Sequence, residues 1–174
     1  MKVVLKYGRR EKVLHIPPKA DISVLEAAEL PILNNIEQTL ERILTHPIGC
    51  EPFENMVQAV KPKKVSIAVP DETRPVPIKE ILPILVRRIH AAIPGLASEA
   101  VTVVIGGGLH PPMDREGIRR IIPSEIAGSC RFVAHDAIQS KMVDFGVTRR
   151  GTPVRINAEY AEADFKIEFG IQSI

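Results

Sequence analysis

The 174-residue chain has no tryptophan, two tyrosines and five phenylalanines, and its 23 Lys and Arg side chains nearly balance 21 Asp and Glu. A formal net charge of +2 gives no strong field for nucleic acid, and few aromatic rings are present to stack on bases. No hydrophobic run reaches the length of a membrane span, and the amino terminus lacks the apolar core of a signal peptide. We therefore expect a cytoplasmic protein that binds neither nucleic acid nor a membrane.

Cysteine is also scarce. Cys50 and Cys130 are far apart and form no CxxC pattern, so neither a disulfide framework nor a zinc site is predicted. We expect two buried thiols in a reducing compartment. No two histidines have the i, i+4 spacing of a helical metal site, and no carboxylate cluster matches a metal-binding loop. No metal ligand is therefore assigned to this chain.

The chain does have the length and composition of one globular domain, with 45% hydrophobic and 25% charged residues. Alternating side chains over residues 3–7 and 12–16 predict a β-hairpin, and apolar residues at helical spacing predict helices over residues 33–45 and 51–60. We expect these first 60 residues to pack on a sheet formed by residues 61–174, and not to form a separate domain.

From residue 64 onward, strands alternate with helices. Compact apolar runs predict buried strands at residues 64–69, 100–105, 131–134 and 164–169. Between them the pattern predicts helices over residues 78–93, with a kink at Pro83, and 114–121, a hairpin over 142–147 and 153–156, and a helical turn at 160–163. This order predicts an α/β fold, a Rossmann-like parallel βαβ sheet with helices on both faces.

Polar segments follow three of these strands directly. They are Asp71-Glu72-Thr73-Arg74-Pro75, Gly106-Gly107-Gly108-Leu109-His110 and His135-Asp136. The carboxyl ends of parallel strands share one edge of a sheet, and ligands bind in the crevice outside that edge. The three segments are therefore predicted to face one cleft.

Each segment also has a structural explanation. Asp71 and Thr73 could cap the helix that follows, and Arg74 could form a structural ion pair, although its planar fork suits a carboxylate or phosphate. Gly107 and Gly108 let the backbone approach a ligand closely, or simply make a tight turn. They lack the GxGxxG spacing and the P-loop lysine, so on their own they are a weak indication of a nucleotide.

The histidines leave similar alternatives. A histidine fixed at a strand end suits general acid/base chemistry, so His110 is either such a group or an ordinary surface residue. The pair His135-Asp136 is either an oriented histidine or, as we favour, a turn. His15, His46 and His90 lie in a predicted strand, at a helix end and on a polar helix face, so we expect structural roles for them.

Four segments resemble, in order, the lactate racemase family. The stretch from Asp71 to Pro77 and the helix after it resemble the DxTRPxP signature of that family, and Gly108-Leu109-His110-Pro111-Pro112 resembles its GxHRP-like loop, with Pro111 where Arg is common. His46-Pro47-Ile48-Gly49 is similar to its NPIG-like turn, and Ala161-Glu162-Ala163-Asp164 to its AEAD segment. The resemblance covers most of the chain and corresponds to the N-terminal domain of these enzymes.

This resemblance implies a racemase or epimerase that acts on a small 2-hydroxy acid and passes a hydride to a nickel-pincer nucleotide. It implies that His110 is a catalytic acid/base group and that Arg74 binds substrate. Asp71 and Thr73 would shape the cofactor and substrate cleft, together with the glycines at 107 and 108. His135 and Asp136 would be further, less central members of the cleft.

The chain departs from the family pattern near its end. No second histidine, no glycine-rich segment with the lysine that anchors the cofactor, and no second domain follow residue 170. We therefore expect a fragment whose partner is its own C-terminal domain, which is inactive alone and in which an exposed apolar face allows self-association. A non-catalytic anion- or nucleotide-binding module with the same cleft is the alternative, and a purely structural domain is a weaker one.

Overall fold

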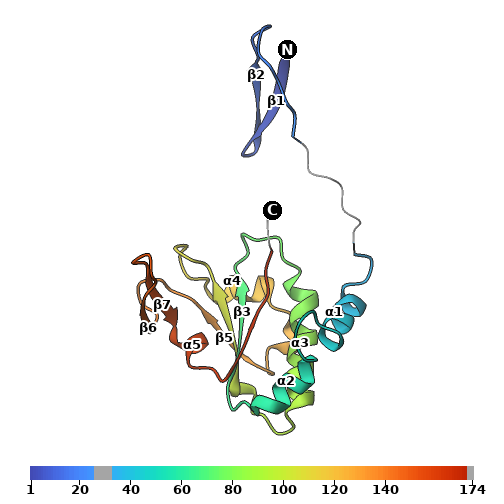
Figure 1. Cartoon of the computed structure of the whole chain (residues 1–174), viewed down its shortest axis with the longest axis vertical. Coiled ribbons are helices and arrows are strands. Elements are labelled where there is room, and N and C mark those ends of the chain that lie inside the picture. Colours follow the sequence, from blue (N-terminus) through green and yellow to red (C-terminus); the bar gives the residue numbers. More distant parts are fainter. Residues whose placement is uncertain (26–32, 172–174) are drawn as a thin grey trace. The chain divides into compact units, whose positions relative to one another are not determined.

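The computed structural model describes residues 1–25 and 33–171, and Figure 1 shows the elements in order. The chain divides into two compact units, Met1–Ile32 and Leu33–Ile174, and each is described by itself. The first unit contains the predicted hairpin. The prediction that this hairpin packs on the sheet stays a prediction.

The hairpin consists of β1 (Lys2–Tyr7) and β2 (Arg10–His15), which pair antiparallel. Tyr7 is opposite Arg10, so only two residues form the turn, and the first of them, Gly8, has a positive φ of 61°. Two-residue hairpin turns require positive φ there, and glycine adopts it without strain. The predicted hairpin is confirmed.

The second unit is built on four parallel strands, β3 (Val65–Pro70), β4 (Val101–Gly106), β5 (Arg131–Ala134) and β8 (Phe165–Glu168). Their order across the sheet is β5-β4-β3-β8. The chain therefore runs outward from β3 to β5 and then returns to place β8 on the other side of β3. The predicted α/β class and the parallel sheet are confirmed.

One face of the sheet is covered by α2 (Phe53–Val60), α3 (Ile78–Ala92) and α4 (Arg115–Ile121). Alternate residues of β3 and β4 face these helices, because side chains alternate along a strand. The buried residues of this core include Val65, Ile67, Val69, Val101, Val103, Ile105, Phe53, Val57, Leu82, Val86 and Ile89. Pro83 lies within α3, and the predicted kink there stays a prediction.

The other face has a smaller cover. The hairpin of β6 (Met142–Val147) and β7 (Pro153–Asn157) leads into α5 (Ala158–Ala161), which contacts both β3 and β4. Two short 3-10 helices, Ser98–Ala100 and Ser124–Ile126, precede β4 and β5. Helices thus cover both faces, as predicted, although the cover of this second face is a single short turn of helix.

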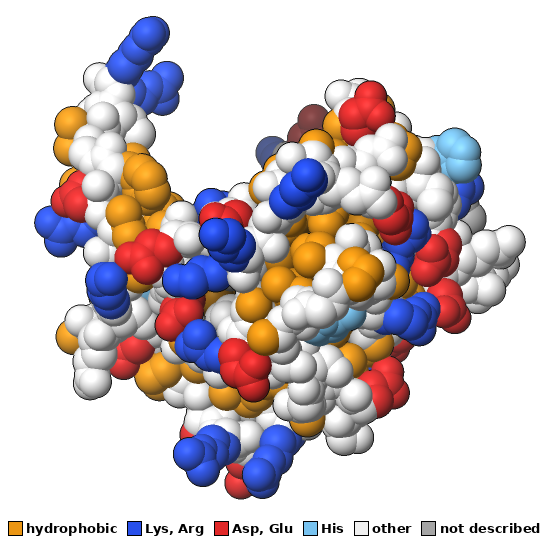
Figure 2. All heavy atoms as spheres, turned by 90° about the horizontal axis from the view of Figure 1, so that it is seen from below, with side chains coloured by type: hydrophobic (Ala, Val, Ile, Leu, Met, Phe, Trp, Pro, Cys, Tyr) orange, Lys and Arg blue, Asp and Glu red, His pale blue; other side chains and the backbone are white. Residues whose placement is uncertain are grey.

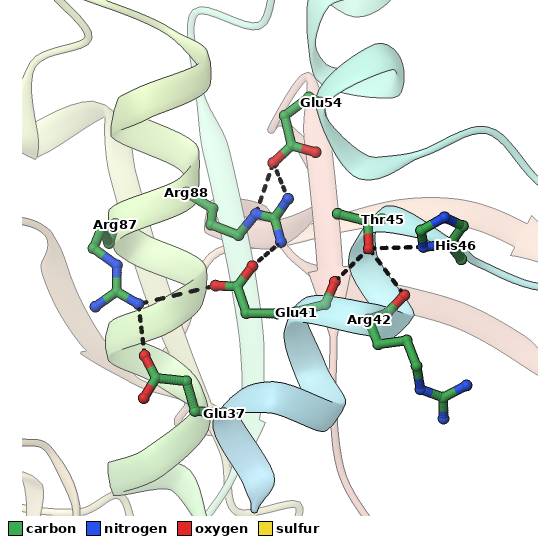
Figure 3. A network of polar contacts seen from close by, with 8 residues as sticks. All are labelled: Glu37, Glu41, Arg42, Thr45, His46, Glu54, Arg87 and Arg88. Carbon is green, nitrogen blue, oxygen red and sulfur yellow. Dashed lines mark hydrogen bonds and ion pairs between the residues drawn. The ribbon is translucent and has the colours of Figure 1, made fainter.

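The helix α1 (Ile36–Thr45) begins three residues later than predicted, because Asn35 caps it by accepting a hydrogen bond from the backbone N–H of Gln38. A network of ion pairs then joins α1 and α2 to α3 (Figure 3). Arg88 of α3, 13% exposed, contacts Glu41 of α1 and Glu54 of α2. These contacts are the polar complement of the packing beneath the sheet.

The surface fits the near-zero net charge. Figure 2 views the molecule from below Figure 1 and shows acidic and basic side chains interspersed, with hydrophobic areas between them. Cys130 is buried, and burial raises its pKa to about 12, whereas Cys50 is exposed, so the expectation of two buried thiols is wrong for Cys50. Within residues 1–25 and 33–171, no helix is both long enough and apolar enough to cross a membrane.

Candidate functional site

The loop after β3 is organised by Asp71, whose side chain is almost fully buried at 8% exposure. Its Oδ1 accepts hydrogen bonds from the backbone N–H and the hydroxyl of Thr73, at 3.1 and 2.6 Å. The backbone N–H of Arg74 donates to the carbonyl of Asp71 at 3.2 Å. Because α3 begins only at Ile78 and has no side-chain cap, Asp71 and Thr73 do not cap that helix.

The loop after β4 returns to the same carboxylate. Gly108 has a positive φ of 60°, and the N–H of His110 donates to the carbonyl of Gly107 at 3.0 Å, which closes a tight turn. A Cβ on Gly107 would lie 3.4 Å from Oδ2 of Asp71 and 3.6 Å from Cβ of His110. The glycines therefore let the histidine loop lie directly against the aspartate loop.

Nδ1 of His110 lies 2.6 Å from Oδ2 of Asp71. A carboxylate only accepts hydrogen bonds, so Nδ1 carries the proton and donates it. Burial alone would raise the pKa of Asp71, but the hydrogen bonds from His110 and Thr73 together outweigh it and hold that pKa below its ordinary value of 3.8. The His110 side chain is 53% exposed, so a ligand can approach the remaining ring nitrogen, Nε2.

A crevice opens where the strand order reverses, between β3 and β8. It has a volume of about 550 Å³ and is lined by the ends of β3, β4 and β8, by Arg74 and by the segment that follows β8. Such a reversal is where α/β sheets bind ligands. Arg74 also lines an adjoining hollow of about 320 Å³ that contains Asp71. Within the described part of the chain Arg74 forms no ion pair, so its fork is available to an anion.

A further contact fixes the aspartate loop from outside. Glu72, next to Asp71, pairs with the guanidinium of Arg120 on α4 through two contacts of 3.2 Å. The pair is largely exposed and therefore contributes little stability. It nevertheless ties the loop after β3 to the helix that follows the histidine loop.

His135 and Asp136 have different partners. Nδ1 of His135 lies 3.0 Å from the side-chain nitrogen of Asn157, which is itself buried. Asp136 accepts hydrogen bonds from the backbone N–H groups of Gln139 and Ile138, and these bonds lower its pKa. Asp136 thus forms the turn we favoured, whereas His135 is held by a specific partner.

The structure therefore brings four predicted residues into direct contact, namely Asp71, Thr73, Gly107 and His110, and places Arg74 in the same loop. Two others were missed. Asn157 could have been noticed as a capping-type residue before a predicted helical turn, which it is: its side-chain oxygen accepts from the N–H of Glu159. Glu168 gave no signal, because it reads as an ordinary outward residue of an edge strand.

Glu168 lines the crevice from β8 and accepts a 2.6 Å hydrogen bond from the hydroxyl of Tyr160. Burial and this carboxylate together raise the pKa of Tyr160. The other histidines have structural contacts, as expected for two of them: His46 with the Thr45 hydroxyl, and His90 with the carbonyl of Ser129. His15 lies exposed in the hairpin.

Two further observations bear on metals and on alternative sites. Among residues 1–25 and 33–171, no group of three or more His, Cys, Asp or Glu side chains is placed to hold a metal ion. A larger hollow, of about 760 Å³, lies between α3, α4 and β5 and has basic side chains over an apolar floor. Its lining contains no histidine, so it lacks the acid/base group found at the strand ends.

Comparison with known proteins agrees with this fold and site. The family model described as the lactate racemase N-terminal domain matches residues 7–173. A lactate racemase of Lactiplantibacillus plantarum is 30% identical over 135 residues, which cover 77% of this chain and 31% of that protein. A lactate racemase of Thermoanaerobacterium thermosaccharolyticum is 24% identical over 171 residues, which cover 97% of this chain and 39% of that one.

A solved structure shows the same fold. The lactate racemase apoprotein from Thermoanaerobacterium thermosaccharolyticum matches with a TM-score of 0.74 at 24% identity, covering 97% of this chain and 38% of that chain. The present chain thus spans between three and four tenths of the length of these relatives. The match of the family model over nearly all residues shows that the chain belongs to the lactate racemase N-terminal domain family.

Proposed function

We propose that this chain forms the substrate-facing part of a racemase or epimerase that acts on a lactate-like 2-hydroxy acid. The observation that carries the proposal is the contact between Asp71 and His110. A buried carboxylate holds Nδ1–H of a half-exposed histidine, so the lone pair of Nε2 points away from its partner. That is the arrangement of a general base that accepts a proton from a hydroxyl group.

In this proposal each residue has one task. Nε2 of His110 takes the proton of the substrate 2-hydroxyl and later returns it. Asp71 positions the ring and stabilises the imidazolium that forms. Arg74 binds the substrate carboxylate through its fork, for which its position in the crevice and its lack of an ion pair in the described part of the chain are suited. Thr73 keeps Asp71 in place through two hydrogen bonds.

The nickel-pincer nucleotide implied by the family fits this site in part. The crevice beside Gly106 and Arg74 is large enough and cationic enough for the anionic end of a nucleotide. No ligand set for its metal occurs among residues 1–25 and 33–171. When bound, the nucleotide would supply the acceptor for the hydrogen on the substrate carbon. The second acid/base group that inversion requires is not assigned to this chain.

The test uses the full-length protein that contains this domain, loaded with the cofactor and given a single enantiomer of lactate. Chiral chromatography should show both enantiomers accumulating until their amounts are equal. Binding of lactate without conversion would instead favour the alternative, a non-catalytic anion-binding module with the same cleft. Neither binding nor conversion would refute both proposals.

A further inference from the structure

The second histidine at the strand ends is held in the opposite way to His110. Asn157 caps α5, because its side-chain oxygen accepts the N–H of Glu159 at 2.9 Å. That bond fixes the orientation of the amide, so the NH₂ group of Asn157 is the part that faces Nδ1 of His135 at 3.0 Å. An NH₂ group only donates, and Nδ1 of His135 must therefore be the acceptor. In the neutral ring the proton then resides on Nε2.

The two histidines thus present different groups to a ligand. His110, held by a carboxylate, offers a lone pair on Nε2, whereas His135, held by an amide, offers an N–H on Nε2. Asn157 is 8% exposed and therefore protected from exchange of partners. The side chain of His135 is half-buried, so its ring is accessible from one side only.

The position of His135 in the sheet places it beside the crevice. Ile105 pairs with Ala134 in the ladder, and the N–H of His135 donates to the carbonyl of Ile105 at 2.9 Å. His135 is therefore next to Gly106, and by alternation it faces the side of the sheet opposite the α3 core. Gly106 lines the crevice, and the nearest atom to a Cβ built on it would be the carbonyl oxygen of Val69 at 3.7 Å. The space above Gly106 is thus open.

We propose that His135 binds an anionic oxygen of a ligand, a carboxylate or phosphate oxygen, seated over Gly106, and that Asn157 is the positioning residue that keeps its Nε2 protonated. The inference rests on the proposed function for the identity of the cleft. Arg74 lines the same crevice and supplies positive charge. Glu168 also lines it, from β8, where the hydroxyl of Tyr160 occupies one of its oxygens, so the anion lies on the β4 side.

The proposal can be tested on this chain without catalysis. Long-range ¹H–¹⁵N spectra at neutral pH should show the Nε2–H tautomer for His135 and the Nδ1–H form for His110. The substitution Asn157→Asp keeps the cap of α5, because aspartate accepts the same hydrogen bond, but turns an acceptor towards His135. It should switch His135 to the Nδ1–H tautomer and leave His110 unchanged. The Nδ1–H form in the wild-type chain would overturn the proposal.

Titration with inorganic phosphate and, separately, with lactate should shift the Nε2 signal of His135. The stronger of the two responses identifies the anion as cofactor-like or substrate-like. Asn157→Asp should weaken binding about tenfold, the equivalent of one charge-assisted hydrogen bond. His135→Gln, whose side-chain N–H can replace Nε2–H, should retain binding, and His135→Leu should lose it. No response of His135 to either anion would refute the proposal even if the full-length enzyme racemises lactate.

Discussion

The substitution Asp71→Asn changes the chemistry of His110 while preserving the shape of the site. Oδ1 of Asp71 accepts two hydrogen bonds from Thr73, so the introduced amide keeps its oxygen there and turns its NH₂ towards Nδ1 of His110. His110 must then accept at Nδ1 and carry its proton on Nε2, which removes the lone pair that the proposed mechanism requires. We expect the rate of racemisation in the full-length protein to fall about 10²–10⁴-fold.

The same substitution should have a modest and pH-dependent effect on stability. Loss of the charge from three hydrogen bonds to a buried carboxylate costs about 1–2 kcal/mol. The pKa of Asp71 is lower in the folded protein than its ordinary value of 3.8, so this contribution is complete above pH 3.8 and disappears as the pH falls below that value and the carboxylate is protonated. Urea denaturation at neutral and acidic pH should therefore show the two proteins converging in acid.

Three measurements check the reasoning. Nitrogen chemical shifts of His110 should show the change of tautomer, and Glu72→Gln, the same change at the neighbouring exposed position, should leave His110 and the activity as they are. A protein with Asp71→Asn that still shows Nδ1–H at His110, or that racemises lactate at the wild-type rate, would refute the role given to Asp71.

Further predictions concern the scaffold and the anion site. Arg88→Ala should lower the free energy of unfolding by about 1–3 kcal/mol, because it removes the partner of Glu41 and Glu54 from a largely buried position, whereas Arg87→Ala, 61% exposed, should cost less than about 0.5 kcal/mol in the same denaturation assay. Gly108→Ala should cost about 1 kcal/mol through its positive φ alone, since no atom lies within 4 Å of the added Cβ. Arg74→Lys should raise KM for the hydroxy acid about tenfold, since a point charge does not reproduce the fork; an unchanged KM would exclude Arg74 from the substrate site.

Much of the fold could be predicted from local pattern. The strand β5 has the bounds predicted from its apolar run, and the helix after Asp114 begins where that residue caps it. The order of the strands could not be predicted, because nothing in the sequence of β8 indicates that it returns beside β3 and not beside β5. The reversal that creates the crevice is a property of that order.

The candidate site was predicted to the level of strand ends and no further. That Asp71 and His110 face one edge follows from parallel strands, but the bond between them joins residues 39 apart, and its 2.6 Å length depends on the turn at Gly107. The alternative that Asp71 caps a helix was locally reasonable, and it is wrong because the loop continues for several residues before α3 begins. The tautomer of His135 depends on Asn157, which only the folded chain brings to it.

The most direct test of the proposed mechanism is the racemisation rate of full-length protein carrying His110→Ala, compared with His46→Ala as a matched control at a histidine whose contact is with Thr45 at the end of α1. Both variants should fold like the wild type by circular dichroism. The account predicts that conversion of single-enantiomer lactate falls at least about 10²-fold with His110→Ala and is unchanged with His46→Ala. Wild-type conversion by the His110 variant would contradict it.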